Sequence, residues 1–318
     1  LTNLAPGGIA TITLPWATLG LATGSYTLAA YTVVDGVTNQ AGGATVAGVV
    51  SGTGLGARPV DALGSLGGFC DAIVTAGSFA YLGEGATLTV LDLANPAVPV
   101  KRGSLRLAGS IRALAISGSY VFAACGEAGF HVVNISLPDS PALSQSFNSS
   151  GFAYGLSISG STLALADGIS GLRLFNIASP AAPALLGSYA TIGPARDVIL
   201  ASSTAYVLDG FEGLRILNVA SPAAPVLLGS LNLPNGQALA LSGTRAIVAD
   251  ENALLSVVNV ASPASPALLG RLQLAAPALG LAVSGNYAYL ASGAAGLVTI
   301  DLANSAAPTQ THSAATAS

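Results

Sequence analysis

The sequence predicts an all-β fold, a six-bladed β-propeller of four-stranded antiparallel blades. Three observations support this prediction. A proline-containing loop recurs every 41 or 42 residues, four short apolar runs separate one loop from the next, and no stretch shows the 3.6-residue period of an amphipathic helix. A period near 40 residues with four strands in each unit is typical of propeller blades.

An Asn or Asp precedes each proline loop and anchors the repeat. These anchors are Asp92, Asn134, Asn176, Asn218, Asn259 and Asp301. Proline lacks an N–H group and fixes φ, so it stops a strand ladder and turns the chain. An Asn or Asp side chain can accept a hydrogen bond from a nearby backbone N–H. We interpret the loop as the turn between the third and fourth strands of each blade.

The unit that begins at residue 151 illustrates the four strands. "GFAYGLSISG" and "STLALADG" meet at a glycine turn, "LRLFNIASP" leads to the proline loop, and "PALLGSY" leaves it. Six copies of the second strand begin after such turns. The stretch 59–66 matches the fourth strand of later units, whereas the last copy, "APTQTHS", is degenerate. Because an open edge strand favours aggregation, we expect 59–66 to supply the outer strand of the sixth blade.

The sequence divides into a partial β segment at 1–57, the propeller at 58–313 and a tail at 314–318. Within the first segment, "GSYTLAAYTVVDG" is similar to strands of bacterial immunoglobulin-like modules. Such a sandwich needs about seven strands, and 57 residues hold three or four. Three alternatives would complete this β-sandwich-like extension: strands outside this sequence, packing on the propeller, or a strand from a neighbouring subunit. The last would produce a filament.

Two middle units, "DGISGLRLFNIASPAAPALLGSY" (167–189) and "DGFEGLRILNVASPAAPVLLGSL" (209–231), resemble the LVIVD-repeat family of bacterial and archaeal β-propellers. The resemblance extends over roughly residues 58–308. The first copy lacks the "GLR" element and the last lacks the first proline. Membership would imply a surface or secreted propeller without a shared catalytic motif, and the resemblance assigns no functional residue.

Charge is sparse. Charged residues make up 8% of the chain, the net charge is −4, and the ten Lys and Arg residues are scattered, so no basic patch for nucleic acid is expected. No apolar run approaches the roughly 20 residues of a membrane span. A small, neutral surface favours an extracellular or cell-surface location. The expected partners are further copies of the chain or other surface proteins.

The two cysteines, Cys70 and Cys125, fall at the start of one blade's first strand and in the second turn of the next blade. We expect these positions to be neighbours and predict a disulfide that joins adjacent blades; two buried thiols are the alternative. No catalytic residue, metal site or cofactor is predicted. His131 occupies the position of Arg173 and Arg215 in later units, where we expect a solvated or rim position.

The second turn of each unit carries a set of equivalent residues on one face of the ring. They are Glu84, Cys125, Asp167, Asp209, Asp250 and Ser292. Four carboxylates around one mouth could hold Ca²⁺ or a cationic ligand, but Asp-Gly is also what a tight β-turn requires, and we favour the turn interpretation.

The function we infer from the sequence is a non-catalytic structural or interaction module of a bacterial or archaeal cell-surface or extracellular assembly. It could be a filament subunit joined through the N-terminal strands. The alternative is a ligand-binding or enzymatic propeller with its site at the channel mouth. The candidate residues for that site, at the start of the first strands, are Asp71, Arg112, Tyr154 and Arg196, with Gln237 and Leu279 at the equivalent positions.

Overall fold

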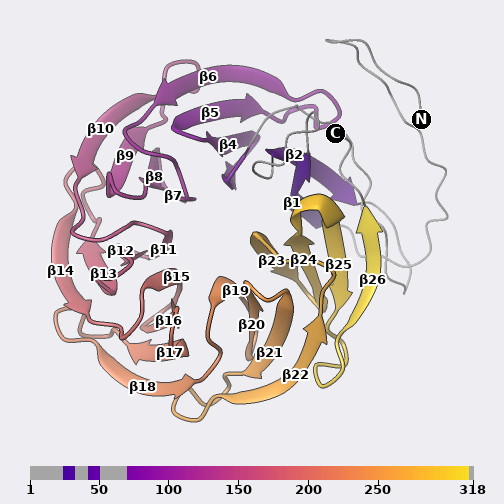
Figure 1. Cartoon of the computed structure of the whole chain (residues 1–318). Coiled ribbons are helices and arrows are strands. Elements are labelled where there is room, and N and C mark those ends of the chain that lie inside the picture. The colour runs from indigo at the N-terminus through magenta and orange to yellow at the C-terminus, as the bar shows by residue number, and fades with distance from the viewer. Residues whose placement is uncertain (1–23, 33–41, 51–69, 315–318) are drawn as a thin grey trace.

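The computed structural model describes residues 24–32, 42–50 and 70–314 of the chain. They form six four-stranded sheets and one two-stranded hairpin. Figure 1 shows the six sheets set radially around a common axis, with one edge of each sheet toward the centre. The predicted six-bladed propeller is therefore confirmed.

Each blade uses four strands that are consecutive in the chain, and every neighbouring pair within a blade is antiparallel. The strands of blades one to three are β3 (Ala72–Ala76), β4 (Phe79–Glu84), β5 (Thr87–Asp92) and β6 (Val100–Arg106); β7 (Ala113–Ser117), β8 (Tyr120–Ala124), β9 (Phe130–Asn134) and β10 (Ala142–Phe147); and β11 (Gly155–Ser159), β12 (Thr162–Ala166), β13 (Leu172–Asn176) and β14 (Ala184–Tyr189).

The strands of blades four to six are β15 (Ala195–Ala201), β16 (Thr204–Asp209), β17 (Gly213–Asn218) and β18 (Val226–Leu231); β19 (Gly236–Ser242), β20 (Arg245–Asp250), β21 (Leu254–Asn259) and β22 (Ala267–Gln273); and β23 (Gly280–Ser284), β24 (Tyr287–Ala291), β25 (Leu297–Asp301) and β26 (Thr309–Ala314). A single 3₁₀ turn, η1 (Gly293–Ala295), is the one helical element among the described residues. The first strand of each blade lies nearest the axis and the fourth lies outermost (Figure 1).

The outer strand of the sixth blade differs from the expectation. β25 pairs with β26, from Asp301 opposite Thr309 to Leu297 opposite Ala314, so the C-terminal part of the chain fills this position. The short loop after Asp301 brings β26 directly against β25, and this local pairing takes the edge that we had assigned to 59–66. Residues 59–66 themselves lie outside the described residues.

The N-terminal segment contributes one described hairpin. β1 (Gly24–Thr32) pairs antiparallel with β2 (Gly42–Val50), with Gly24 opposite Val50 and Thr32 opposite Gly42. β1 contains most of the stretch "GSYTLAAYTVV" that the sequence assigned to a strand. The rest of residues 1–57, and the way in which the segment is completed, lie outside the described part of the chain.

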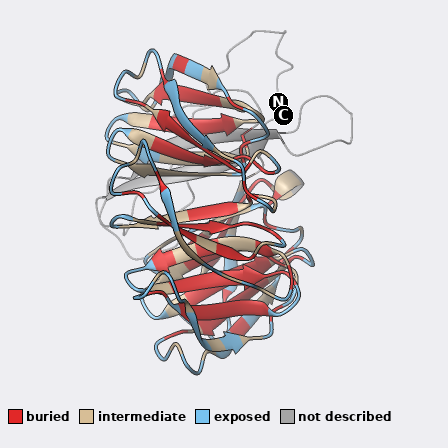
Figure 2. Cartoon of the chain, turned by 90° about the vertical axis from the view of Figure 1, so that its left-hand side faces the viewer, coloured by how far each residue is buried: buried red, intermediate tan, exposed pale blue. Residues whose placement is uncertain are grey.

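The hydrophobic core lies between successive blades. The two middle strands of each blade carry most of the buried side chains, whereas the outer strands are largely exposed (Figure 2). One cluster between blades two and three contains Phe122, Phe130, Leu163 and Phe175, and similar clusters fill the other gaps from blade one to blade six. A sheet with apolar faces is stable only when other sheets cover those faces. Each repeat forms one such sheet, so successive repeats pack face to face around the ring.

The proline loop has the structure that its sequence predicts. All six third strands end at the anchor Asn or Asp. In every blade the anchor's side-chain oxygen accepts a hydrogen bond from the N–H two residues later, as Asn218 does from Ala220 at 2.9 Å. A four-residue turn with proline at its second position follows in five of the blades, closed by bonds such as Ala224 N–H to Ser221 O at 2.9 Å.

The second turn of a blade is joined to the first strand of the next blade. Gly126 and Ala153 exchange two backbone hydrogen bonds of 3.1 and 3.0 Å, and Gly168 and Ala195 do the same at 3.1 and 2.8 Å. Gly126 and Gly168 have φ values of 60° and 54°, a left-handed conformation that glycine adopts without strain. This contact places the second turns beside the starts of the inner strands.

Within residues 24–32, 42–50 and 70–314, no helix is long and apolar enough to span a bilayer.

Candidate functional site

The residues at the starts of the inner strands occupy equivalent places around the ring. Asp71, Arg112 and Tyr154 each donate their backbone N–H to the carbonyl of the residue at or near the end of their blade's second strand, over 2.9, 2.7 and 2.9 Å. Arg196 lies at a β-bulge in β15, where the pairing shifts between Ala195 and Asp197. Bulges redirect side chains, and they often occur beside functional sites. We call this set of residues the channel mouth.

Contacts link three of the four predicted mouth residues. The guanidinium carbon of Arg112 lies 5.7 Å from the ring centroid of Phe152, and the Phe152 and Tyr154 rings are 4.4 Å apart. The guanidinium carbon of Arg196 lies 5.9 Å from the Tyr154 ring. Two neighbouring aromatic rings therefore lie between two cations along one arc of the mouth, at distances where cation–π attraction operates.

The arc ends in a carboxylate. Arg196 Nη1 lies 2.9 Å from Glu251 Oε1, and Gln237 Nε2 donates a hydrogen bond to the same oxygen. Among the described residues, the buried Nε of Arg196 has no hydrogen-bond partner. At the other end, burial raises the pKa of Asp71, and the positive charge of Arg112 offsets part of that rise. Leu279 is exposed and adds no polar group.

Asp197 was missed by the sequence analysis. Its Oδ1 accepts the Val198 N–H at 2.8 Å, and its Oδ2 accepts the Leu239 N–H of the next blade at 2.9 Å. Burial raises the pKa of Asp197 to about 7, and these two N–H bonds lower it by less. The other five units have Ala or Gly at this place, so the only available signal was one carboxylate at a small-residue position.

The turn carboxylates do not form a common site. Asp209 accepts hydrogen bonds from four backbone N–H groups, those of Ile192, Gly193, Phe211 and Glu212, at 2.8 to 3.2 Å. Asp250 accepts two, from Asn252 and Leu254. In the described ranges, no three His, Cys, Asp or Glu side chains gather in a way that could hold a metal ion. The hydrogen bonds agree with the turn interpretation.

Asp209 also pairs with a buried arginine. Arg215 Nε lies 3.0 Å from Asp209 Oδ2, and neither side chain is more than 9% exposed. Burial raises the pKa of Asp209, but the four backbone N–H bonds together lower it further, so the carboxyl pKa lies below its ordinary value. This buried ion pair stabilises the turn between β16 and β17 in the fourth blade.

The predicted disulfide is not formed. Cys70 and Cys125 both lie in the described part of the chain, both are buried, and no disulfide joins them. Cys125 Sγ lies 3.6 Å from the carbonyl oxygen of Ala123 in its own blade, and burial raises the pKa of this thiol to about 12. Cys125 packs into the apolar cluster between blades one and two, which explains its burial without a bridge.

His131 differs from the sequence prediction of a solvated side chain. It is buried, and its ring nitrogens bond to Ser146 Oγ at 2.8 Å and to the carbonyl oxygen of Ala108 at 2.9 Å. The third strand lies inside the blade, so a polar residue at this position needs partners. Arg215 at the equivalent position meets the same need through Asp209.

Comparison with known proteins identifies the family. The family model described as "LVIVD repeat" matches residues 67–106, 108–149, 150–191, 192–232, 235–273 and 277–316. The six matches correspond to the six blades and cover most of the sequence. The chain belongs to the LVIVD-repeat family. The comparison with curated proteins gave no match.

Solved structures share the fold at low sequence identity. The periplasmic gluconolactonase PpgL of Pseudomonas aeruginosa is similar over 92% of this chain and 97% of its own, with a TM-score of 0.72 and 14% identity. The computationally designed protein Ika8 is similar over 74% of this chain and 71% of its own, with a TM-score of 0.57 and 11% identity. At these identities the likeness concerns the fold alone.

The chemistry available at the mouth is binding and proton exchange. Arg112 and Arg196 can attract an anion, the rings of Phe152 and Tyr154 can stack with a planar or sugar ring, and Asp197 can exchange a proton near neutral pH. Three of these residues, Arg112, Tyr154 and Arg196, were predicted from the sequence. Phe152, Glu251 and Asp197 were not.

Proposed function

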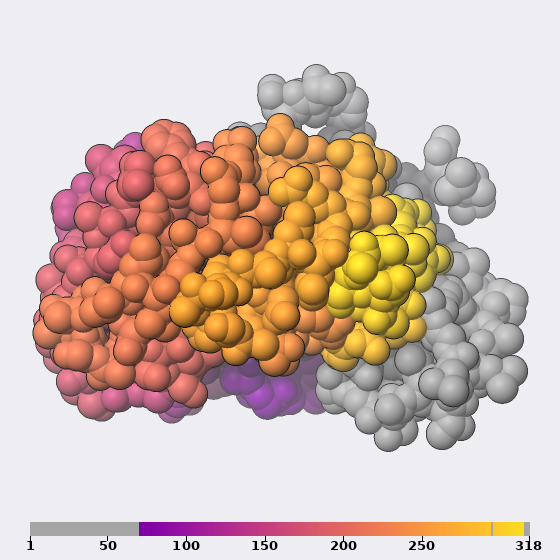
Figure 3. Space-filling model, turned by 90° about the horizontal axis from the view of Figure 1, so that it is seen from below, coloured from indigo at the N-terminus to yellow at the C-terminus, as the bar shows by residue number. Residues whose placement is uncertain are grey.

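We propose that this chain is a non-catalytic interaction module of an extracellular or cell-surface assembly, and that it binds further copies of itself through the outer strands of blades four and five. The observation that carries the proposal is a row of exposed apolar side chains on these two strands, which we call the apolar rim. The rim consists of Val226, Leu227, Leu228, Leu268 and Leu269. In Figure 3 the region of these blades faces the viewer in orange.

The outer strands of blades one, two and six have different surfaces, whereas β14 of blade three, "ALLGSY", is also uncharged and exposes Leu185. β6 reads "VKRGSLR" and carries three positive charges, β10 reads "ALSQSF", and β26 reads "TQTHSA". Charged and polar side chains on an edge strand discourage pairing with another sheet. β18, "VLLGSL", lacks any charge, and β22, "ALLGRLQ", has one arginine. Exposed apolar patches of this kind mark interaction surfaces.

The backbone of the rim supports pairing between copies. Among the described residues, β18 and β22 are the outermost strands of their sheets, so one edge of each carries backbone N–H and C=O groups without a strand partner in that part of the chain. A strand from a second copy can add to such an edge, and the leucines then provide the buried contact. With a net charge of −4 over 318 residues, repulsion between copies is weak.

The composition and the family support the extracellular location that we propose. A chain in which only 8% of the residues are charged suits a protein that packs against neighbours. The family resemblance implies surface or secreted propellers, and the similar gluconolactonase is a periplasmic protein. A second, head-to-tail contact through residues 1–57 would extend rim-paired copies into a filament.

Sedimentation velocity over protein concentrations from about 1 to 100 μM tests the proposal. The native chain should shift to larger species as concentration rises. The double variant Leu227→Glu, Leu268→Glu should remain monomeric, because it places carboxylates on both rim strands. Leu143→Glu is the matched control, since Leu143 has the equivalent position in β10, outside the rim. A native chain that stays monomeric throughout would contradict the proposal.

Deletion of residues 1–57 separates the two contacts. If the N-terminal segment joins rim-paired copies into filaments, the deletion should abolish filaments in negative-stain images and leave the rim-dependent species intact. If the deletion changes neither, the N-terminal contact is wrong and the rim proposal stands alone.

A second candidate function is ligand binding or catalysis at the channel mouth. It is favoured by the buried Nε of Arg196, which has no hydrogen-bond partner in the described part of the chain, and by the raised pKa of Asp197. Because a similar fold belongs to a gluconolactonase, gluconolactone is a reasonable probe. Hydrolysis above the buffer rate that is lost in Asp197→Asn would favour this candidate over the first. No hydrolysis and no binding of the probe would count against it.

A further inference from the structure

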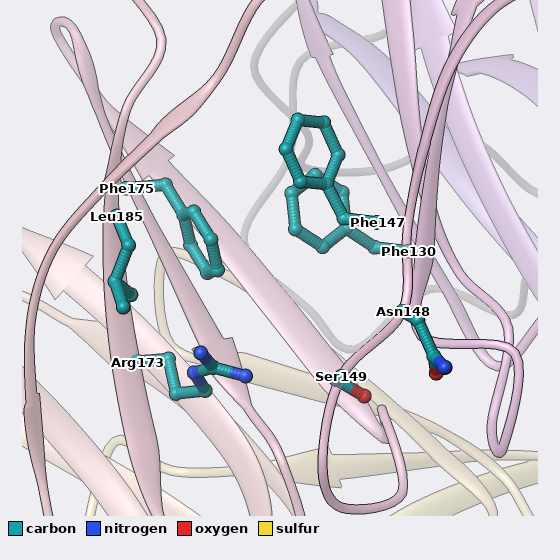
Figure 4. Close-up of a pocket in the computed structure, with 7 residues that line it drawn as sticks. All are labelled: Phe130, Phe147, Asn148, Ser149, Arg173, Phe175 and Leu185. Atoms are coloured by element: carbon teal, nitrogen blue, oxygen red, sulfur yellow. The ribbon is translucent and has the colours of Figure 1, made fainter.

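A cavity of about 170 Å³ lies between blades two and three, away from both the channel mouth and the apolar rim. Phe130 and Phe147 of blade two form one side, and Phe175 and Leu185 of blade three form the other. Arg173 and Ser149 add polar groups to the lining. Figure 4 shows Phe175 and Arg173 extending from the same strand toward the side where Phe130 and Phe147 lie.

Three aromatic rings gather at this cavity. The Phe130 and Phe147 rings are stacked with centroids 4.7 Å apart and planes 9° apart. Phe175 meets Phe130 edge-on at 4.9 Å and Phe147 at 6.2 Å. At the next blade interface the equivalent residues are Leu172, Tyr189 and Leu217. The aromatic lining is thus specific to this interface and does not follow from the repeat.

Arg173 is held more loosely than its counterpart in the next blade. Its Nη1 lies 3.5 Å from Asp167 Oδ2 and 3.5 Å from Ser150 Oγ, whereas Arg215 Nε lies 3.0 Å from Asp209. The Arg173 side chain is 20% exposed, and that of Arg215 is 9% exposed. The guanidinium therefore keeps N–H groups available to a ligand.

A buried hydroxyl supplies a second, independent sign of a ligand site. Ser149 lines the cavity and is 9% exposed, yet among the described residues its Oγ has no hydrogen-bond partner. Buried polar groups are nearly always paired, so an unpaired hydroxyl at a cavity calls for a partner. Asp167, which is fully buried behind Arg173, is not part of the lining.

We propose that this cavity binds a small carboxylate that carries one aromatic ring. The three phenylalanines hold the ring, the Arg173 guanidinium pairs with the carboxylate, and the Ser149 hydroxyl donates a hydrogen bond to it. An apolar cavity of about 150 Å³ accommodates benzene, so the volume suits a single ring with a short polar substituent. The cationic group over the Phe175 ring, 5.7 Å from its centroid, places the charge beside the aromatic site. This binding site is additional to the assembly function proposed above.

Phenylacetate is the probe, titrated into the full chain and followed by NMR or calorimetry. We expect saturable binding to one site with a dissociation constant of about 1 mM or below, which is the range expected for a ligand with about ten non-hydrogen atoms. Phenylacetamide, which keeps the ring and lacks the charge, should bind at least about 10-fold more weakly, since hydrogen bonds to ionised groups are the stronger ones. Benzylamine should not bind, because its positively charged ammonium group would be repelled by the Arg173 guanidinium.

Two matched variants locate the site. Leu185→Trp should fill the cavity and weaken phenylacetate binding at least about 10-fold. Leu143→Trp is the control at the equivalent position of β10, with the same 51% exposure, and should bind as the native chain does. Both residues are exposed, so neither change is expected to disturb folding. Absence of saturable binding, equal binding of phenylacetamide, or equal effects of the two tryptophans would overturn the proposal.

Discussion

A Cβ atom at Gly229, in the outer strand of blade four, would lie 2.5 Å from the carbonyl oxygen of Pro263 in the proline loop of blade five. The same relationship holds for Gly103 with Pro138 at 2.4 Å, for Gly187 with Pro222 at 2.3 Å and for Gly270 with Ser305 at 2.4 Å. The proline loop of one blade therefore packs on the outer strand of the preceding blade, and this packing needs glycine.

Gly229→Ala should lower the free energy of unfolding by about 1–3 kcal/mol, because the added methyl group forces the two backbones apart. Urea denaturation measures the change. Ser230→Ala, at the exposed neighbouring position, is the control and should stay within about 0.5 kcal/mol of the native chain. Equal stability of Gly229→Ala and the native chain would show that the loop does not pack on this strand.

The repeat made the fold predictable because local and global signals agree. The anchors Asn176 and Asn218 end their strands as the spacing predicts, and their side chains cap the turns. The "LLG" of the outer strands was visible in the sequence, but its contact with the next blade's loop was not, since it depends on the distance between two sheets. The outer strand of blade six was mispredicted because sequence similarity was weighed above the short loop that brings β26 to β25.

Asp209 and Asp167 occupy equivalent positions with different surroundings. Asp209→Asn should cost about 3 kcal/mol or more of stability, because it weakens four N–H bonds and leaves Arg215 buried without its counter-charge. Asp167→Asn should cost less, since among the described residues neither oxygen of Asp167 accepts a hydrogen bond and Arg173 lies 3.5 Å away. Thermal and urea unfolding of the two variants compare the losses. A larger loss for Asp167→Asn would contradict this account.

Asp197 should make stability depend on pH. Its pKa in the folded protein is about 7 against an ordinary value of 3.8, so between these values the folded state holds a proton that the unfolded state releases. Stability should therefore fall as pH rises from about 4 to about 7, by a few kcal/mol at most, and then level off. Asp197→Asn should remove most of this slope, which urea unfolding at several pH values will show; the remainder comes from Asp71, whose pKa is also raised by burial.

The control for this experiment is Asp139→Asn. The hydrogen bond from Arg102 lowers the pKa of Asp139, so its contribution has the opposite sign: it is present above the ordinary pKa and is lost as pH falls through the lowered value. Asp139→Asn should leave the slope between about pH 4 and pH 7 unchanged. If Asp197→Asn keeps the native slope as well, another group is responsible for it.

The channel mouth was only partly predictable for a physical reason. Arg112, Tyr154 and Arg196 were found because they share one place in the repeat. Glu251 lies in a turn of a different blade, and Asp197 is one residue beyond the repeat position, at a bulge. Such contacts between blades follow from the three-dimensional ring and have no fixed spacing in the sequence. His131 was misplaced for a similar reason, because its partners Ser146 and Ala108 lie on neighbouring segments.

Hydrogen–deuterium exchange at low and high protein concentration tests the proposed self-association most directly. The amides of β18 and β22 should become protected as concentration rises, because strand addition would occupy their free edges, while those of the charged outer strand β6 should not change. The rim variant Leu227→Glu, Leu268→Glu should show no concentration dependence. Exchange in β18 and β22 that is the same at every concentration would contradict the account.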